Sequence, residues 1–450
     1  MDQAPDHPAE KKMIDIVWIV PRVPWPPRCG ASVANCALIQ AVAKLGYRIH
    51  LVCFTERATD VQMLGATLEL QTDLPVHKVS LFRWPFFLRH RWLRMAVMLI
   101  GELVSPHLPL SVRPFASECC QKFLREMIDQ NPQALFLWDG LHPMAAVSTG
   151  KELNQKKPLR AQKHIYRAHN IESALWEGYA RQAFFPLNLF IQRQVVRMRK
   201  FEGHCLRSVD AIACVNESDH LWLNTTIAPR PVSDVVPISV DAPLSLKNNR
   251  SGRLTRLKTT DANNRALSLL WLGGLDWWPN RQGIHWFMET IWSELLKQNK
   301  QFTLTLVGKK TEQLKFSNQP NVTAHGHASS LTDIFASTDA MIVPILSGSG
   351  IRVKALQALA HGVPCLGTRF GLSGIPQKGV WFCDDVQDWI ETLLALTAEQ
   401  CVQKGLAGFE MISREFSQKN ASAKMQRLIS RLDFETHEKS DNAGLAHQLL

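Results

Sequence analysis

A glycine loop that leads into a basic helix carries the clearest chemical signal in this sequence. The segment Ser347-Gly-Ser-Gly-Ile-Arg-Val-Lys-Ala opens a helical pattern that Gly362 ends. A helix N-terminus presents unpaired N–H groups and the positive end of the helix dipole, so it favours anions such as phosphate. Arg352 and Lys354 place two cations in this first turn, where they oppose the dipole. A bound anion would resolve that conflict, so the segment predicts a phosphate site. The alternative is a capped surface helix with incidental basic residues.

The four small residues of this loop suit close contact with a phosphate group. Gly348 and Gly350 have no side chain to keep a ligand away from the backbone. Ser347 and Ser349 add hydroxyl groups that can donate hydrogen bonds. We therefore expect these four residues to surround the bound group.

Length and composition predict a globular protein of about two or three domains with anionic partners. The chain has 450 residues, of which 46% are hydrophobic and 20% charged. Its net charge of +11 favours nucleotides, phospholipid surfaces or nucleic acid as partners. No recognised nucleic-acid module accompanies this charge, so we do not expect nucleic acid to bind.

The cysteine pattern and the first residues favour a cytoplasmic location. The 10 cysteines are scattered, with no C-x-x-C and no His/Cys metal spacing, which indicates reduced thiols and no metal site. Residues 1–12 are polar and charged, unlike a signal peptide. No apolar run approaches the ~20 residues of a membrane-spanning helix. We therefore expect a cytoplasmic protein.

Short apolar runs alternate with helical patterns along the chain, which predicts parallel α/β units. The expected strands cover residues 14–20, 49–54, 134–138, 164–168, 211–215, 267–272, 302–307, 340–343, 364–366 and 380–382, and one more strand ends near Ala324. The fold class is therefore α/β, with two doubly wound Rossmann-like domains, 13–241 and 266–410. Residues 242–265 are polar and lack periodicity, so they form the expected linker. A helix over 411–433, which could cross back to the first domain, and a polar tail over 434–450 complete the chain.

Two doubly wound domains place a cleft between the carboxyl ends of their strands, where ligands of such sheets bind. The proline-rich loop at 21–30 and the glycine loop at 347–350 both follow expected strands. We therefore expect these two loops to face each other across the cleft.

Six segments, in this order, resemble the glycosyltransferases of the GT-B fold, most closely family 4, which retains the anomeric configuration of the sugar. They are Ile19-Val-Pro-Arg-Val-Pro-Trp-Pro-Pro-Arg-Cys-Gly, His169-Asn-Ile-Glu-Ser, Val215-Asn-Glu-Ser-Asp, Val236-Pro-Ile-Ser-Val-Asp, Leu272-Gly-Gly-Leu-Asp-Trp-Trp-Pro-Asn and Val343-Pro-Ile-Leu-Ser-Gly-Ser-Gly-Ile-Arg-Val-Lys. The resemblance covers nearly the whole chain. It implies that the first domain binds an acceptor and the second a nucleotide-sugar donor.

The resemblance implies a donor site in the second domain. It places the pyrophosphate on residues 348–350, with Arg352 and Lys354 neutralising the charge of the leaving nucleoside diphosphate. Such enzymes usually need no divalent metal, so we expect neither cofactor nor metal, the nucleotide-sugar being a substrate. Gly326 and His327 would lie near the nucleobase, with a simple turn as the alternative. The implied donor-binding residues are Gly273, Gly274, Gly326, Ser347, Gly348, Ser349, Gly350 and Gln357.

Residues of the first domain receive implied roles as well. His169 becomes a contact of the donor sugar and is grouped with Arg352 and Lys354 as catalytic. The alternative for His169 is a capping or packing histidine. The implied acceptor-binding residues are Gly30, Ser32 and Asp139. An N-cap of a helix near residue 142 is an equally good interpretation of Asp139.

Residues 81–100 mix aromatic and basic side chains, a composition that suits the headgroup region of a membrane. A peripheral contact with the inner face of the membrane would bring the cleft beside a lipid-linked acceptor. The alternative is a helix buried in the first domain with its arginines pointing outward.

The resemblance implies a hexosyltransferase-type enzyme that moves a sugar from a nucleotide-sugar to a glycan or lipid-linked acceptor with retention, in surface polysaccharide biosynthesis. Two differences from the usual motifs of the family support an alternative. In this alternative the protein resembles a glycosyltransferase but has weak or no catalytic activity, and serves as a binding or scaffold protein. Gln357 stands where most members have a glutamate that binds the ribose hydroxyls, and glutamine carries no charge. The usual Arg and Lys after the first strand of the second domain are also missing, with Gly274 and Gln282 near those places and Arg281 as a potential helper.

Overall fold

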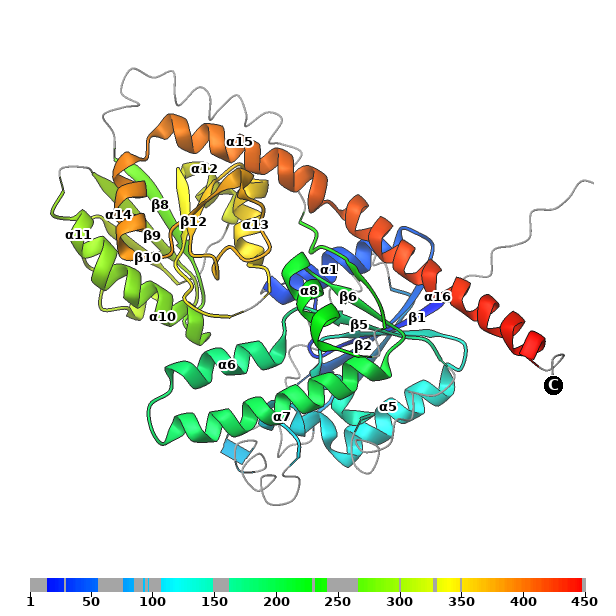
Figure 1. Ribbon diagram of the computed structural model, residues 1–450. Coiled ribbons are helices and arrows are strands. Elements are labelled where there is room, and N and C mark those ends of the chain that lie inside the picture. Colours follow the sequence, from blue (N-terminus) through cyan, green and yellow to red (C-terminus); the bar gives the residue numbers. More distant parts are fainter. Residues whose placement is uncertain are drawn as a thin grey trace, which may run out of the picture.

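Two α/β domains pack together, and the last helix of the chain runs from the second domain along the first (Figure 1). In this computed structural model the described residues are 14–27, 30–55, 76–84, 92–93, 96, 107–148, 162–228, 231–240, 266–298, 301–326, 330–348 and 350–446, with side chains as far as residue 432. The expected linker at 242–265 lies outside the described residues, as do His327 and Ser349.

The first domain is built on a parallel sheet that has seven strands in the described residues. In spatial order these are β3 (Lys78–Arg83), β2 (Arg48–Thr55), β1 (Asp15–Val20), β4 (Leu135–Asp139), β5 (His164–Ala168), β6 (Ala211–Cys214) and β7 (Val232–Val235). The helical segments are α1 (Gly30–Ala43), η1 (Leu110–Ala116), α5 (Glu118–Gln130), η2 (His142–Ala146), α6 (Glu172–Gln182), α7 (Leu187–Ser208) and α8 (Glu217–Thr226). The strand order reverses between β1 and β4, so ligands are expected beyond the carboxyl ends of these two strands.

The second domain repeats this plan with six parallel strands in the described residues. In spatial order they are β10 (Val322–His325), β9 (Phe302–Val307), β8 (Leu267–Leu272), β11 (Ala340–Val343), β12 (Cys365–Gly367) and β13 (Val380–Phe382). The helical segments are α10 (Trp278–Trp286), η4 (Phe287–Trp292), α11 (Ser293–Leu295), η5 (Thr311–Gln313), α12 (Leu331–Ser337), α13 (Val353–Ala360), η6 (Gln377–Gly379), α14 (Val386–Ala395), α15 (Ala398–Glu415) and α16 (Gln418–Ala446). Here the order reverses between β8 and β11, and the glycine loop follows β11.

The expected α/β fold class is confirmed, and every strand expected from the sequence is present within one residue at each end. Two strands were missed, β3 and β7, which form the two edges of the first sheet. Their residues are mostly only partly buried, and β7 has the polar sequence Val-Ser-Asp-Val. An edge strand is covered less fully, so it lacks the continuous apolar run that marks the inner strands.

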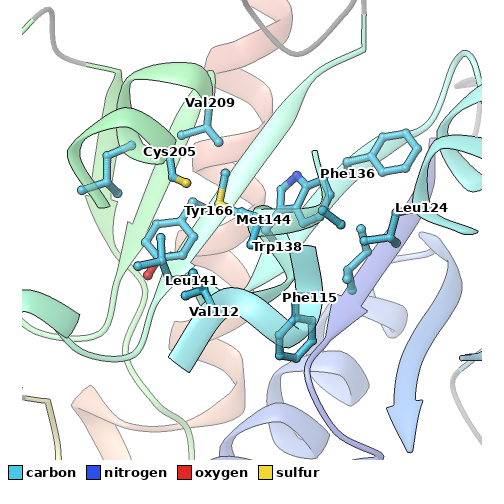
Figure 2. Close-up of a cluster of buried hydrophobic side chains, with 14 of the residues drawn as sticks. Val112, Phe115, Leu124, Phe136, Trp138, Leu141, Met144, Tyr166, Cys205 and Val209 are labelled. Atoms are coloured by element: carbon cyan, nitrogen blue, oxygen red, sulfur yellow. The ribbon is translucent and has the colours of Figure 1, made fainter. Parts of the chain in front are cut away.

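Alternate residues of each inner strand enter cores on opposite faces of the sheet. Val17 and Ile19 point into one core, whereas Ile16 and Trp18 point into the other. Figure 2 shows part of the first of these cores, where Trp138 and Tyr166 from the sheet meet side chains of the flanking helices. Burial on both faces explains why these strands are apolar nearly throughout.

The C-terminal helix differs from the expectation of one helix over 411–433 followed by a polar tail. Helix α15 ends at Glu415, and α16 begins at Gln418 and continues to Ala446. The new start has a local cause, because Ser417 Oγ accepts the N–H of Asn420 at 3.2 Å, which is an N-cap. Helix α16 contacts α1, β6 and β7, and its buried Met425 and Leu428 belong to the core that contains Ile16 and Trp18.

The segment 81–100 is only partly described, and part of the membrane prediction for it is wrong. Phe82 and Trp84 are buried and pack against Phe54 at ring-centroid distances of 5.4 and 5.5 Å. They belong to the core and cannot face a membrane. Trp92 and Leu93 are exposed. Within the described residues, no helix combines the length and the apolar character that crossing a bilayer requires.

Candidate active site

Two helix N-termini meet where the domains face each other. Gly30 opens α1 and Val353 opens α13, and a β-carbon on Gly30 would lie 3.3 Å from Val353 Cβ. Ser32 lies in the first turn of α1 and is partly buried. Both helices direct the positive ends of their dipoles at this junction, so it is electrostatically suited to an anion.

The glycine loop of the second domain reaches the first domain at this junction. Gly350 has φ +76° and Gly348 φ +120°, backbone conformations that side chains disfavour. A β-carbon on Gly350 would collide with Asn170 Oδ1 and with the carbonyl oxygen of His169, so only glycine fits. The predicted phosphate loop therefore touches the segment that carries His169.

Arg352 lies at the centre of the junction. It is the N-cap residue of α13, and its guanidinium carbon lies 5.1 Å above the ring of Trp277. A β-carbon on Gly348 would lie 3.4 Å from Arg352 Nη2, so the guanidinium is beside the glycine loop. Burial lowers the pKa of Arg352 to about 10, while Asp219 and Tyr179 oppose that shift. The side chain is still a cation at neutral pH.

Asp219 in the first domain provides a negative charge toward Arg352. It is buried in the first turn of α8, where Asn216 Nδ2 donates to its carboxylate at 2.9 Å. Burial raises the pKa of Asp219 to about 6, although the hydrogen bond from Asn216 and the charge of Arg352 lower it. The Val215–Asp219 motif thus supplies a residue whose role the sequence did not indicate.

Helix α6 of the first domain also contacts the second domain, where the donor site is expected. Gln182, the last residue of α6, donates to Ser347 Oγ at 3.0 Å and accepts from Trp278 Nε1 at 2.9 Å. Its amide therefore holds the start of the glycine loop and the start of α10 together. Nothing in the sequence around Gln182 predicted this role, because the contact depends on the packing of two domains.

His169 is held by a buried polar network. Its Nε2 forms a short contact with Asp139 Oδ1, and the histidine side chain stays partly exposed. The other carboxylate oxygen of Asp139 accepts from Trp18 Nε1 at 2.9 Å and from Arg167 Nη1 at 3.1 Å. Arg167 also donates to Asn35 on α1 at 3.1 Å. The network joins β1, β4, β5 and α1 behind His169.

Asp139 differs from both interpretations offered by the sequence. It does not cap a helix, because η2 has Leu141 at its N-cap position and no side-chain cap. Its carboxylate is fully buried, so it cannot contact an acceptor directly. Burial would raise the pKa of Asp139, but the charges of His169 and Arg167 and the hydrogen bonds from His169 and Trp18 hold it below its usual value. The carboxylate is therefore an anion that orients His169.

A glutamate from α7 caps the helix that follows His169. Glu202 accepts the N–H groups of Glu172 and Ser173 at 2.8 and 3.1 Å, and the hydroxyl of Ser173 at 2.6 Å. Burial raises the pKa of Glu202 to about 7, against the lowering effect of these hydrogen bonds. Because α6 begins three residues after His169, this cap also fixes the loop that carries the histidine.

The other residues expected at the donor site belong to the segments after β8 and β10 and to helix α13. Gly273 and Gly274 follow β8. Gly273 packs tightly against the loop after β9, since a β-carbon on Gly308 would collide with the carbonyl oxygen of Gly273. Gln357 and Lys354 are partly buried residues of α13. Gly326 follows the edge strand β10, and its N–H donates to Glu312 Oε1 at 2.9 Å.

The structure thus brings most of the expected site residues to one junction. The members that lie there are Gly30, Ser32, His169, Ser347, Gly348, Gly350, Arg352 and Lys354. Gly326 lies at the sheet edge, and Ser349 is outside the described residues. Among the described residues, no group of three or more His, Cys, Asp or Glu side chains could hold a metal ion.

The fold is that of the GT-B proteins, as expected. The chain is similar to sucrose-phosphate synthase from Thermosynechococcus elongatus, with a TM-score of 0.63 and 14% identity over 94% of this chain and 100% of that one. TarM of S. aureus has a TM-score of 0.61 at 9% identity, covering 92% and 99% of the two chains. Anabaena HepE, in complex with UDP and glucose, has a TM-score of 0.56 at 12% identity, covering 93% and 100%.

The second domain also matches a protein family by sequence. Residues 266–399 match the family described as glycosyl transferases group 1. No curated protein gives a significant sequence match. The resemblance to GT-B glycosyltransferases is therefore confirmed, whereas membership of family 4 and retention of configuration stay predictions.

Proposed function

We propose that the protein transfers a sugar from a nucleotide-sugar donor to an acceptor, with retention of configuration. The observation that carries this proposal is the meeting of the α1 and α13 N-termini at the glycine loop, with Arg352 beside it. Two positive helix ends and a cation meet there, and although Asp219 offsets part of the charge of Arg352, the arrangement favours a bound anion. A diphosphate carries the negative charge that such a position favours.

The chemistry follows from this arrangement. As the bond from the sugar to the diphosphate breaks, negative charge develops on the leaving phosphate. Arg352, Lys354 and the N–H groups of α13 would stabilise that charge, and so favour the transition state over the bound substrate. His169, fixed by Asp139, would contact the donor sugar on the side of the first domain. Neither cofactor nor metal has a part in this proposal.

The comparisons support a uridine nucleotide as the first donor to test. HepE has been crystallised with UDP and glucose, and TarM with UDP and alpha-GlcNAc-glycerol. For this chain we propose a glycan or lipid-linked acceptor, and hence a part in surface polysaccharide biosynthesis. A lipid-linked acceptor would bring the protein to the inner face of the membrane, where Trp92 and Leu93, both exposed, could contact lipid.

Calorimetric titration with UDP, GDP and ADP tests the donor site, using the wild-type protein and the variants Arg352→Ala and Lys354→Ala. We expect one nucleotide to bind and Arg352→Ala to weaken it about 10- to 100-fold, the loss of one charged hydrogen bond. The matched control is Arg369→Ala, an exposed arginine of the same domain that pairs with Asp384, which should leave affinity unchanged.

The products decide between an active and a silent protein. Donor hydrolysis or transfer that Arg352→Ala abolishes establishes activity, and NMR of the released sugar gives its anomeric configuration. Nucleotide binding without turnover would instead favour the silent binding or scaffold protein. If no nucleoside diphosphate binds, or if Arg352→Ala binds as wild type, the proposal is wrong.

A further inference from the structure

The turn between α6 and α7 exposes large apolar side chains. Phe184 and Phe185 are 74% and 76% exposed, and Leu187 and Leu189 are 44% and 51% exposed. The two helices run together and end in this turn, away from the sheet (Figure 1). A contiguous exposed apolar segment of this kind marks a contact surface. We call residues 184–189 the apolar tip.

The surface that continues from the apolar tip along α7 is basic. Leu189, Arg193, Val196 and Lys200 are all exposed, and their spacing of four, three and four residues places them on one face of the helix. The one acidic residue of α7, Glu202, is buried at the other end. An apolar end followed by a positive face is typical of a helix that lies on an anionic lipid surface.

We propose that the apolar tip inserts into the headgroup region of an anionic bilayer, while Arg193 and Lys200 contact lipid phosphates. The net charge of +11 acts in the same direction, because it draws the whole protein toward a negative surface. This docking site is separate from residues 81–100, on which the sequence had placed the membrane contact. It does not depend on whether the protein transfers sugar.

A second copy of the chain fits this surface less well. Four side chains, each partly exposed, offer on the order of a few hundred Å², whereas a stable interface buries roughly 800 Å² per partner. A two-fold contact through α7 would also bring Arg193 and Lys200 near their own copies, and like charges at an interface oppose association.

Membrane docking at the apolar tip would place the junction of the two domains beside the bilayer. Gln182, which contacts Ser347 of the glycine loop and Trp278, lies two residues before Phe184. The lipid contact and the start of the phosphate loop are thus adjacent in the structure. An acceptor embedded in the bilayer would reach the junction without leaving the membrane surface.

Vesicle flotation tests the proposal with the full chain. The probes are vesicles of phosphatidylglycerol mixed with phosphatidylcholine, compared with phosphatidylcholine alone. We expect at least 10-fold more bound protein on the anionic vesicles. Phe184→Ser with Phe185→Ser should lower that fraction at least five-fold, and Arg193→Gln with Lys200→Gln should lower it and reduce its dependence on salt.

The matched control is Leu221→Ser on α8, a residue that is 66% exposed, which should bind vesicles as the wild type does. Circular dichroism and nucleotide titration verify that each variant is folded. The proposal is wrong if the wild type binds anionic vesicles no better than neutral ones. It is also wrong if the double phenylalanine variant binds anionic vesicles as the wild type does. If sedimentation velocity shows that the wild type is a dimer and the double phenylalanine variant is a monomer, the apolar tip binds a second copy of the chain instead.

Discussion

Gly350 of the second domain lies directly against Asn170 of the first. A β-carbon at Gly350 would stand 3.2 Å from Asn170 Cγ and would overlap the side-chain oxygen. The absence of a side chain at one position therefore sets how closely the two domains approach. The glycine loop serves the domain contact as well as the predicted phosphate site.

Gly350→Ala should weaken nucleotide binding because it pushes the glycine loop away from His169 and Asn170. The residue also has φ +76°, so alanine adds backbone strain of about 1 kcal/mol. We expect affinity for the nucleoside diphosphate to fall at least 10-fold by calorimetric titration. Gly46→Ala is the control, because it has φ +93° but open space around its Cβ position. Equal affinities in the two variants would contradict the close contact.

Asp139→Asn should destabilise the first domain strongly. It removes the anion that faces Arg167, which is fully buried, and an uncompensated buried charge typically costs about 3–5 kcal/mol. The midpoint of urea unfolding measures this loss. Trp18→Phe, which removes only one hydrogen bond to the same carboxylate, should cost about 1 kcal/mol beyond its change in packing. A loss below 1 kcal/mol in Asp139→Asn would mean that the carboxylate is not the partner of Arg167.

Glu202 should make stability depend on pH near neutrality. Burial raises its pKa to about 7, whereas an unfolded glutamate titrates near 4.5. Between these two values the folded state holds more protons than the unfolded state, so stability falls as pH rises from about 4.5 to 7. The total loss can reach ~3 kcal/mol.

Glu202→Gln cannot ionise and keeps one acceptor oxygen for the α6 cap. Urea unfolding at pH 5, 6 and 7 should therefore show wild-type stability declining relative to this variant. Parallel profiles for the two proteins would show that Glu202 is already ionised at pH 5.

Gln357→Glu should change donor binding if residue 357 contacts the ribose. A carboxylate accepts hydrogen bonds from hydroxyls more strongly than an amide does, so affinity should rise by up to about 10-fold. Gln377→Glu makes the same charge change at an exposed position of η6 and serves as the control. If both variants change the affinity for the donor equally, the cause is a general charge effect, and the predicted contact between residue 357 and the ribose is wrong.

The sequence was sufficient for the inner strands and for the glycine loop. Strands buried on both faces have continuous apolar runs, and the loop combines small residues with cations in a short span. The edge strands β3 and β7 have no such signal.

Other parts of the site come from contacts between distant segments. Gln182 meets Ser347 only because the domains pack in one orientation. Trp277 meets Arg352 because β8 and β11, the strands that precede them in the chain, are neighbours in the second sheet. The sequence indicated either an acceptor contact or a helix N-cap for Asp139, which follows an expected strand. Trp18 and Arg167, each on a different strand, give it a buried place that local sequence cannot indicate.

The return of α16 to the first domain has a consequence for how the chain folds during synthesis. Met425 and Leu428 fill a core that Ile16 and Trp18 began more than 400 residues earlier. The first domain made by the ribosome therefore lacks part of its interior until the last helix emerges. Until α16 is synthesised, the apolar side chains on that face of the first sheet stay exposed to solvent. The second domain is continuous from 266 to 415, so it can fold before the first domain is complete. A chain that stops before residue 418 would leave that face permanently uncovered.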